Sequence, residues 1–142
     1  MARGTGAAPS RLTNGTLFLD SQGLSLLFDD DLRMAARLKD AVQQDLRIAT
    51  SVVTLVEAMN PKRAQPRWQY VLSRINVLDV TRPIADHAAD LLRAAGLHGH
   101  KYAIDAIVAA TAMAQPGPTR LCTSDVDDVS RLCDGSILLI AV

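Results

Sequence analysis

The chain has 142 residues, 49% of them hydrophobic, and its fifteen basic and fifteen acidic residues give a formal net charge of zero. A chain of this length folds most simply as one domain, and the charge of the whole molecule gives no sign of a nucleic-acid partner. Two cysteines argue against a disulfide framework, and no apolar stretch approaches the about 20 residues of a membrane span. Residues 1–14 lack the apolar core of a signal peptide. We therefore expect a soluble, cytoplasmic protein with a loose tail at 1–14 and one domain at 15–142.

Short apolar strands alternate with helices along this domain. The first strand lies in Thr16–Ser21 and shows no period-2 alternation, which is typical of a strand covered on both faces. Further strands are expected at residues 47–49, 76–80, 119–122 and 136–142, and helices at 23–28, 32–44, 52–59, a segment ending near 74, 83–95, 102–113 and 125–132. This alternation predicts an α/β fold with a mostly parallel sheet and right-handed crossovers.

Two helices in the first half of the chain have distinctive surroundings. The acidic triplet Asp29–Asp31 precedes the helix at 32–44, and we interpret it as a loop and N-cap rather than a metal site, since acids oppose the helix dipole favourably. The helix at 52–59 carries an apolar repeat, interpreted as a buried stripe, at Val52, Leu55, Val56 and Met59. Glu57 is one residue off this stripe.

A basic segment follows, with aromatic residues after it. Its cations are Lys62, Arg63 and Arg67, and the aromatics are Trp68 and Tyr70. Such a pattern can stack bases and hold phosphates. We favour the alternative, a solvated helix whose tryptophan packs inward. The histidines near residues 97–101, expected to form a loop, are more typical of a surface turn than of a catalytic site.

Four acids follow or interrupt apolar elements. They are Asp20, Glu57, Asp105 and Asp125. Each alone could be a helix cap or a surface acid. Together they favour a site, because ligands of open α/β sheets bind at the carboxyl ends of strands and an unpaired carboxylate among apolar residues is costly. Converging carboxylates repel and require a cation, and an all-oxygen donor set suits Mg²⁺ or Mn²⁺.

Four segments containing these acids resemble the four motifs of PIN-domain ribonucleases, and most closely the toxin subunits of bacterial VapBC-type toxin-antitoxin pairs. The segments are residues 17–21 (LFLDS), 50–57 (TSVVTLVE), 100–112 (HKYAIDAIVAATA) and 121–128 (LCTSDVDD). The resemblance covers about Leu17 to Val142. It implies a three-layer PIN-like fold with strand order 3-2-1-4-5, a Mg²⁺- or Mn²⁺-dependent endoribonuclease, a cognate antitoxin and a homodimer.

By motif position, the four acids correspond to the acidic quartet of the family. A further acid often follows the fourth one, and we prefer Asp128 to Asp127 because it lies one helical turn after Asp125. Ser21 and Thr123 fall where the family often places a hydroxyl near the metal.

The expected chemistry is metal-assisted hydrolysis of an RNA phosphodiester, with the carboxylates as ligands. Cations at the rim of the site would hold substrate phosphates, and the candidates are Lys62, Arg63, Arg67 and Lys101. A single-stranded or looped RNA would fit better than a duplex.

Three alternatives are open. The chain could be a PIN-fold nuclease of RNA processing or decay, or of structured DNA, without a toxin role. It could be a non-catalytic binding module, although such a module would be expected to lack one or more of the acids. A phosphatase of the aspartyl-nucleophile type would have a second aspartate two residues after Asp20, where Gln22 stands.

Overall fold

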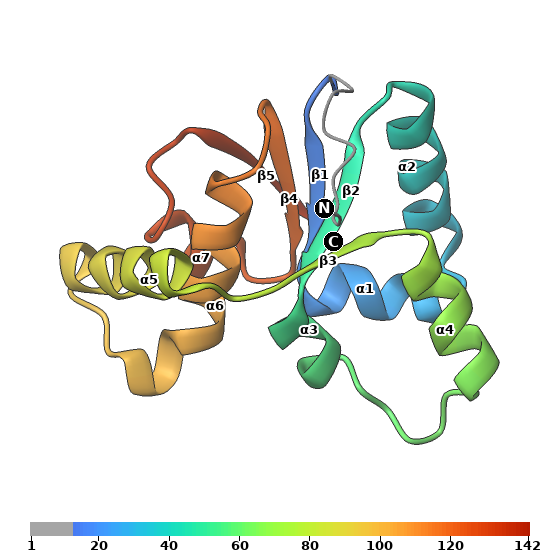
Figure 1. Cartoon of the computed structure of the whole chain (residues 1–142), viewed down its shortest axis with the longest axis horizontal. Helices are drawn as coiled ribbons and strands as arrows, with labels where there is room; N and C mark the ends of the chain where they lie inside the picture. Colours follow the sequence, from blue (N-terminus) through green and yellow to red (C-terminus); the bar gives the residue numbers. More distant parts are fainter. Residues whose placement is uncertain (1–12) are drawn as a thin grey trace.

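Five parallel strands form one sheet in the order β3-β2-β1-β4-β5 (Figure 1), in a computed structural model that describes residues 13–142. The strands are β1 (Thr16–Leu19), β2 (Arg47–Ser51), β3 (Asn76–Leu78), β4 (Thr119–Thr123) and β5 (Ile137–Ala141). All four strand pairs are parallel. The expected α/β class and strand order are confirmed. The proposed tail at 1–14 lies, except for its last two residues, outside the described part of the chain.

Seven helices in the described residues connect the strands. They are α1 (Ser21–Phe28), α2 (Leu32–Gln43), α3 (Val52–Glu57), α4 (Gln65–Ser73), α5 (Arg82–Ala95), α6 (Gly99–Met113) and α7 (Val126–Ser130). No helix among residues 13–142 is long and apolar enough to cross a membrane.

Successive residues of β1 face opposite layers of helices. Leu17 and Leu19 belong to a buried cluster with residues of α1, α2 and α4. Phe18 instead packs with residues of α6 and α7. The two layers stand on opposite sides of the sheet in Figure 1. Because β1 is buried on both faces, its apolar run has no alternation, as the sequence indicates.

Several local predictions are confirmed. The Asp31 carboxylate accepts a 2.8 Å hydrogen bond from the Met34 N–H and caps α2. Gly96 ends α5 with a positive φ of 68°, a conformation that costs glycine little. Trp68 packs inward and stacks on Phe28, with ring centroids 4.5 Å apart. The tryptophan therefore joins α4 to α1.

The buried stripe expected on residues 52–59 is wrong in part. Val56 is 79% exposed and Met59 60% exposed, whereas Thr54 and Ala58 are buried. The helix α3 ends at Glu57, and its Thr54 hydroxyl donates a 2.7 Å hydrogen bond to the Ser51 carbonyl. The helix α3 therefore faces the core with the side that carries Thr54 and, one turn later, Ala58. The apolar repeat predicts a different side.

The loop expected at residues 97–101 is mostly helical. Helix α6 begins at Gly99, and Tyr102 interrupts it with non-helical φ and ψ angles of −113° and 16°. The third strand ends at Leu78, two residues earlier than expected. Both cysteines are free, which agrees with the prediction that no disulfide framework is present.

Candidate functional site

Asp20 lies at the carboxyl end of β1, the central strand, and is the N-cap of α1. Its Oδ1 accepts a 2.9 Å hydrogen bond from the Gly23 N–H. Its Oδ2 accepts a 3.2 Å bond from the Ser124 N–H, 104 residues further along the chain. Burial raises the pKa of Asp20, although these hydrogen bonds and one from Thr123 favour the charged form. The carboxylate is therefore held between the ends of two neighbouring strands.

Asp125 lies at the end of the strand next to β1, where β4 turns into α7. The Thr123 hydroxyl accepts a 3.0 Å hydrogen bond from the Asp125 N–H and so shapes this turn. The Asp125 carboxylate makes no capping hydrogen bond to α7 and is exposed. No side-chain hydrogen bond therefore supports the interpretation of Asp125 as a helix cap, and its carboxylate is available to a ligand.

Asp105 occupies the second turn of α6 and is half-buried. Its pKa is raised to about 6, first by burial and then by the negative charges of four other acids, which are, in decreasing order, Asp125, Asp128, Glu57 and Asp20. Four distant segments of the chain thus bring carboxylates close enough to act on one another. Asp105 has no salt-bridge partner among the described residues, as its apolar helix suggests.

The remaining acids differ in their surroundings. Glu57 ends α3 and is exposed, so the expectation that it is enclosed among apolar residues is wrong. Asp128 is half-buried and its Oδ1 lies 3.7 Å from a guanidinium nitrogen of Arg131. Asp127 is exposed. Asp128, the preferred fifth acid, is one of the charges that raise the Asp105 pKa.

We call these five carboxylates, Asp20, Glu57, Asp105, Asp125 and Asp128, the acidic site. Within residues 13–142, no three acid, histidine or cysteine side chains converge closely enough to hold a metal as they stand. The donor set nevertheless fits a divalent cation, because all donors are carboxylate oxygens and because, besides burial, their negative charges raise the pKa of Asp105. A bound cation would relieve that repulsion.

Two of the four cations expected at the rim are engaged elsewhere. Arg63 pairs with Asp29 at 3.2 Å and donates to the Ala58 carbonyl. Arg67 pairs with Asp30 and donates to the Leu27 carbonyl. The prediction that Arg63 and Arg67 hold substrate phosphates is therefore not supported, because both guanidinium groups join α4 and its preceding loop to the end of α1.

The other two rim candidates remain free of acidic partners among the described residues. Lys62 is exposed, and the Lys101 ammonium lies 5.2 Å from the centroid of the Tyr102 ring. Lys101 lies four residues before Asp105 on α6, although Tyr102 interrupts the helix between them.

A group of buried hydroxyls beneath the acidic site was missed in the sequence. Thr50, Ser51 and Thr54 are fully buried. Thr50 donates a 2.8 Å hydrogen bond to the Leu19 carbonyl and is also hydrogen-bonded to the Thr54 hydroxyl. The group therefore joins the carboxyl end of β2 to the peptide that precedes Asp20. Two threonines four residues apart at a strand-to-helix junction were the available signal.

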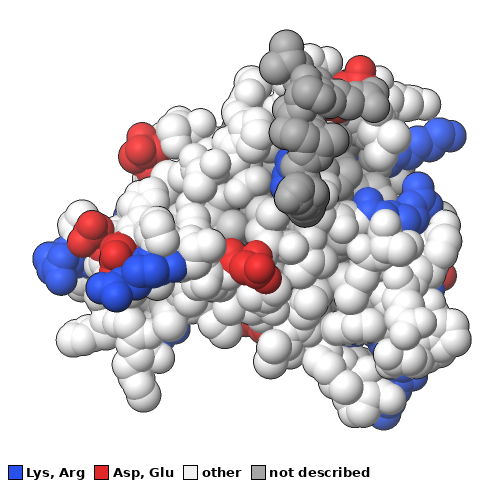
Figure 2. Space-filling view, viewed as in Figure 1, with Lys and Arg blue, Asp and Glu red and all other residues white. Residues whose placement is uncertain are grey.

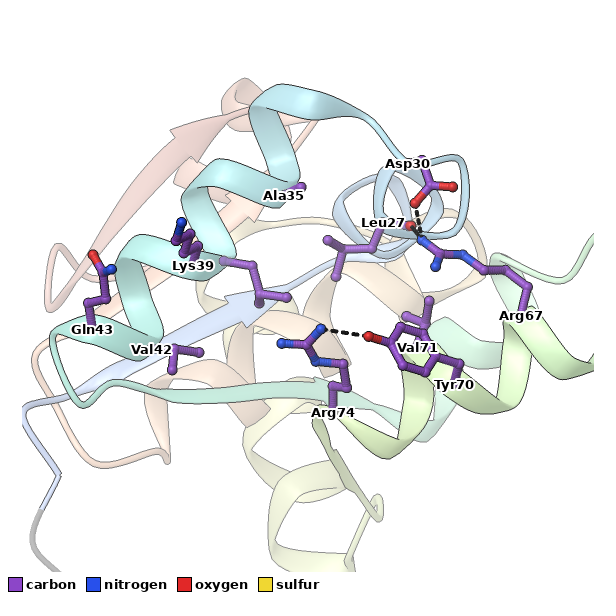
Figure 3. Close-up of a pocket in the computed structure, with 11 residues that line it drawn as sticks. Leu27, Asp30, Ala35, Lys39, Val42, Gln43, Arg67, Tyr70, Val71 and Arg74 are labelled. Atoms are coloured by element: carbon purple, nitrogen blue, oxygen red, sulfur yellow. Dashed lines mark hydrogen bonds and ion pairs between the residues drawn. The ribbon is translucent and has the colours of Figure 1, made fainter.

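A hollow of about 490 Å³ lies between α2 and α4 (Figure 3). Apolar side chains of both helices line it together with Lys39, Arg67 and Arg74, and the Arg74 guanidinium donates a 2.9 Å hydrogen bond to the Tyr70 hydroxyl. Figure 2 shows mainly Lys and Arg over α2 and α4, on the right, whereas α5, on the left, carries both signs. The hollow contains no acid of the acidic site.

Comparisons with known proteins agree with this architecture. The PIN domain family model matches residues 17–133. Three solved structures are similar in fold. VapBC2 from Rickettsia felis, bound to a DNA fragment from its promoter, has 18% sequence identity and a TM-score of 0.70. A toxin-antitoxin complex from Klebsiella pneumoniae has 22% identity and a TM-score of 0.67, and FitAcB from Neisseria gonorrhoeae has 19% identity and a TM-score of 0.65.

Each alignment covers 88–89% of this chain and 96–99% of the matched one. No curated protein sequence matches the chain significantly. The family match extends over most of the domain and includes Asp20, Glu57, Asp105, Asp125 and Asp128. The chain therefore belongs to the PIN-domain family of nucleases.

Proposed function

We propose that this protein is a metal-dependent endoribonuclease that hydrolyses RNA phosphodiester bonds, and that it is the toxin of a type II toxin-antitoxin pair. The observation that carries the nuclease proposal is the convergence on Asp105 of four other carboxylates from three other segments of the chain, whose charges add to the effect of burial in raising its pKa. Three further features support a nuclease. The chain belongs to a family of nucleases, all the donors are carboxylates, and they lie at the carboxyl ends of the strands of a parallel sheet, where ligands bind.

In this proposal Asp20, Glu57, Asp105 and Asp125 are the catalytic ligands, and Asp128 completes the set. Mg²⁺ or Mn²⁺, when bound, would supply a Lewis acid that neutralises charge developing on the phosphate. Asp20 is oriented by the Gly23 and Ser124 N–H groups. One of the carboxylates can accept the proton of the attacking water.

The toxin role is supported by the similar structures, one of VapBC2 and one of a toxin-antitoxin complex. Alignments that cover nearly all of those chains indicate that the domain has the size of a toxin subunit. The partners would be a cognate antitoxin, the RNA substrate and a second copy of the chain, in the cytoplasm.

The first experiment is cleavage of a mixed RNA pool by purified protein in Mg²⁺, in Mn²⁺ and in EDTA. We expect cleavage only with metal. Asp20→Asn and Asp105→Asn should each reduce the rate at least about a hundredfold, since charge stabilisation by a bound metal is worth several kcal/mol. Cleavage in EDTA, or activity retained by both variants, would refute the carboxylate-metal mechanism.

Asp127 and Asp128 provide a matched pair within this experiment. They are neighbours on α7, and Asp128 is half-buried and is one of the charges that raise the pKa of Asp105, whereas Asp127 is exposed. Asp128→Asn should therefore slow cleavage, while Asp127→Asn should leave it near the wild-type rate. The reverse result would assign the fifth acid to Asp127.

Growth of cells that express the chain alone, and together with a small protein encoded beside it, tests the toxin role. Growth arrest that the second protein relieves would support the toxin proposal. Active nuclease without arrest would favour a nuclease of RNA processing or decay.

A further inference from the structure

A second hollow, of about 480 Å³, lies next to the acidic site on the α1 and α2 side of the sheet. Its lining includes Gln22 of α1, Arg33 and Arg37 of α2, and Val142 at the end of β5. Gln22 is two residues from Asp20. The Val142 N–H donates a 3.1 Å hydrogen bond to the Thr123 carbonyl. The hollow therefore lies close to the carboxyl ends of β1 and β4, where Asp20 and Asp125 stand, although none of the five carboxylates lines it.

Two arginines give this hollow a positive wall. Arg33 and Arg37 are four residues apart and hence on one face of α2. Neither has a carboxylate within salt-bridge distance in the described part of the chain. Asp31 also lines the hollow, but its carboxylate is engaged by the Met34 N–H as the cap of α2.

The Arg37 side chain has an unmet hydrogen-bonding requirement. Its Nε is buried and has no hydrogen-bond partner among the described residues. The Nε of Arg47 is also buried without a partner. Arg47 begins β2, however, and so lies at the amino-terminal ends of the strands, whereas the acidic site lies at their carboxyl ends. Leaving a buried charged donor without an acceptor is costly. A guanidinium group matches a phosphate through paired N–H···O bonds, so a phosphate in the hollow that Arg37 lines would supply this side chain with an acceptor.

Of the four cations expected at the rim, Lys62 and Lys101 alone have no acidic partner among the described residues, so further positive groups beside the acidic site would help to hold an RNA strand. Arg63 and Arg67 are paired with Asp29 and Asp30, and the formal net charge of the chain is zero. An RNA strand that reaches a site of five carboxylates must be held by local positive groups against repulsion. Arg33 and Arg37 form no salt bridge within residues 13–142, and their hollow lies close to that site.

We propose that Arg33 and Arg37 form a phosphate subsite that holds the RNA backbone beside the acidic site. Gln22, two residues after Asp20, lies between this subsite and the acidic site. This inference rests on the proposed nuclease function. The two arginines bind and position a phosphodiester next to the cleaved one, and they contact no base edge, so they contribute affinity without sequence preference.

The test is binding of a short labelled single-stranded RNA of mixed sequence, measured by fluorescence anisotropy over a range of salt concentrations in EDTA, where no cleavage occurs. Arg33→Gln and Arg37→Gln should each weaken binding several-fold. Each should also reduce the slope of log K against log salt by about 0.7, the value for one phosphate contact to a single strand. Arg37→Lys, which retains the charge, should restore most of the slope.

Lys39→Gln is the matched control, because Lys39 lies on the same helix but lines the hollow between α2 and α4. It should leave the salt slope unchanged. An equal loss for Lys39→Gln, or an unchanged slope in the Arg33→Gln, Arg37→Gln double variant, would overturn the proposal. A double variant that loses affinity for a labelled acidic peptide and keeps its RNA affinity would overturn it too, and would assign the hollow to a protein partner.

Failure of this inference is distinguishable from failure of the proposed function. Metal-dependent cleavage with unchanged RNA binding in the double variant rejects only the subsite. Loss of RNA binding in the double variant, without metal-dependent cleavage by the wild type, rejects only the catalytic proposal and leaves a binding module.

Discussion

Asp105 is the residue at which the acidic site destabilises the metal-free fold. Its pKa, about 6, exceeds the ordinary value of 3.8, so the folded protein holds this proton more tightly than the unfolded chain does. The protonated carboxyl therefore stabilises the fold fully below about pH 4, and this stability is lost as the pH rises through 6. At neutral pH, repulsion and burial act against folding.

Asp105→Asn should for this reason stabilise the metal-free protein. In EDTA at pH 7.5 we expect a higher Tm than that of the wild type, and near pH 4 the difference should largely disappear. Thermal unfolding at both pH values measures this. The control is Asp134→Asn, since hydrogen bonds from Ser136 lower the Asp134 pKa and its substitution should not stabilise the protein at pH 7.5. An Asp105→Asn variant no more stable than the wild type at pH 7.5 would contradict the assigned electrostatics.

At the scale of elements, the junction between β1, β2 and α3 depends on buried hydroxyls. Thr50 is fully buried and joins the Leu19 carbonyl to the Thr54 hydroxyl. Valine has nearly the same shape but cannot donate a hydrogen bond. Removing one partner from buried polar groups costs about 1–3 kcal/mol.

Thr50→Val should therefore lower the free energy of unfolding by about 1–3 kcal/mol, as measured by urea denaturation. Thr111→Val is the matched control: Thr111 is 1% exposed, and its hydroxyl donates back to the Ile107 carbonyl within α6. That carbonyl keeps its helical partner, so the control should cost less. Equal losses of unfolding free energy in the two variants would show that the hydrogen bond from Thr50 to the Leu19 carbonyl does not stabilise the fold more than a bond within one helix.

At the scale of the whole molecule, metal binding should join segments that are distant in sequence. Mn²⁺ should raise the Tm of the wild type at neutral pH, and EDTA should reverse the effect. At a metal concentration of about 100 times Kd the gain would be about 2.7 kcal/mol. Asp20→Asn and Asp105→Asn should lose most of this stabilisation, whereas Lys39→Gln should keep it. A Tm independent of Mn²⁺ in the wild type would argue against a metal site.

Local features of this protein were predictable because they depend on neighbouring residues. The apolar run of β1 and the caps of α2 and α5 require only short-range contacts. The aspartates that follow or interrupt apolar elements could be identified for the same reason, and the resemblance of four segments to PIN-domain motifs indicated the strand order. By themselves, the residues predicted only a mostly parallel sheet.

Only the tertiary structure decided which charged side chains are free to act. Arg63 is 34 residues from Asp29, and Arg67 is 37 residues from Asp30, yet they pair because α4 packs on α1. Nothing in the local sequence distinguishes Arg33 and Arg37, and the structure places both in a hollow that Gln22, two residues after Asp20, also lines. The sequence by itself determined the elements and their acids through short-range physics. The partners of the cations depend on which elements meet in space, and local patterns carry no information about that.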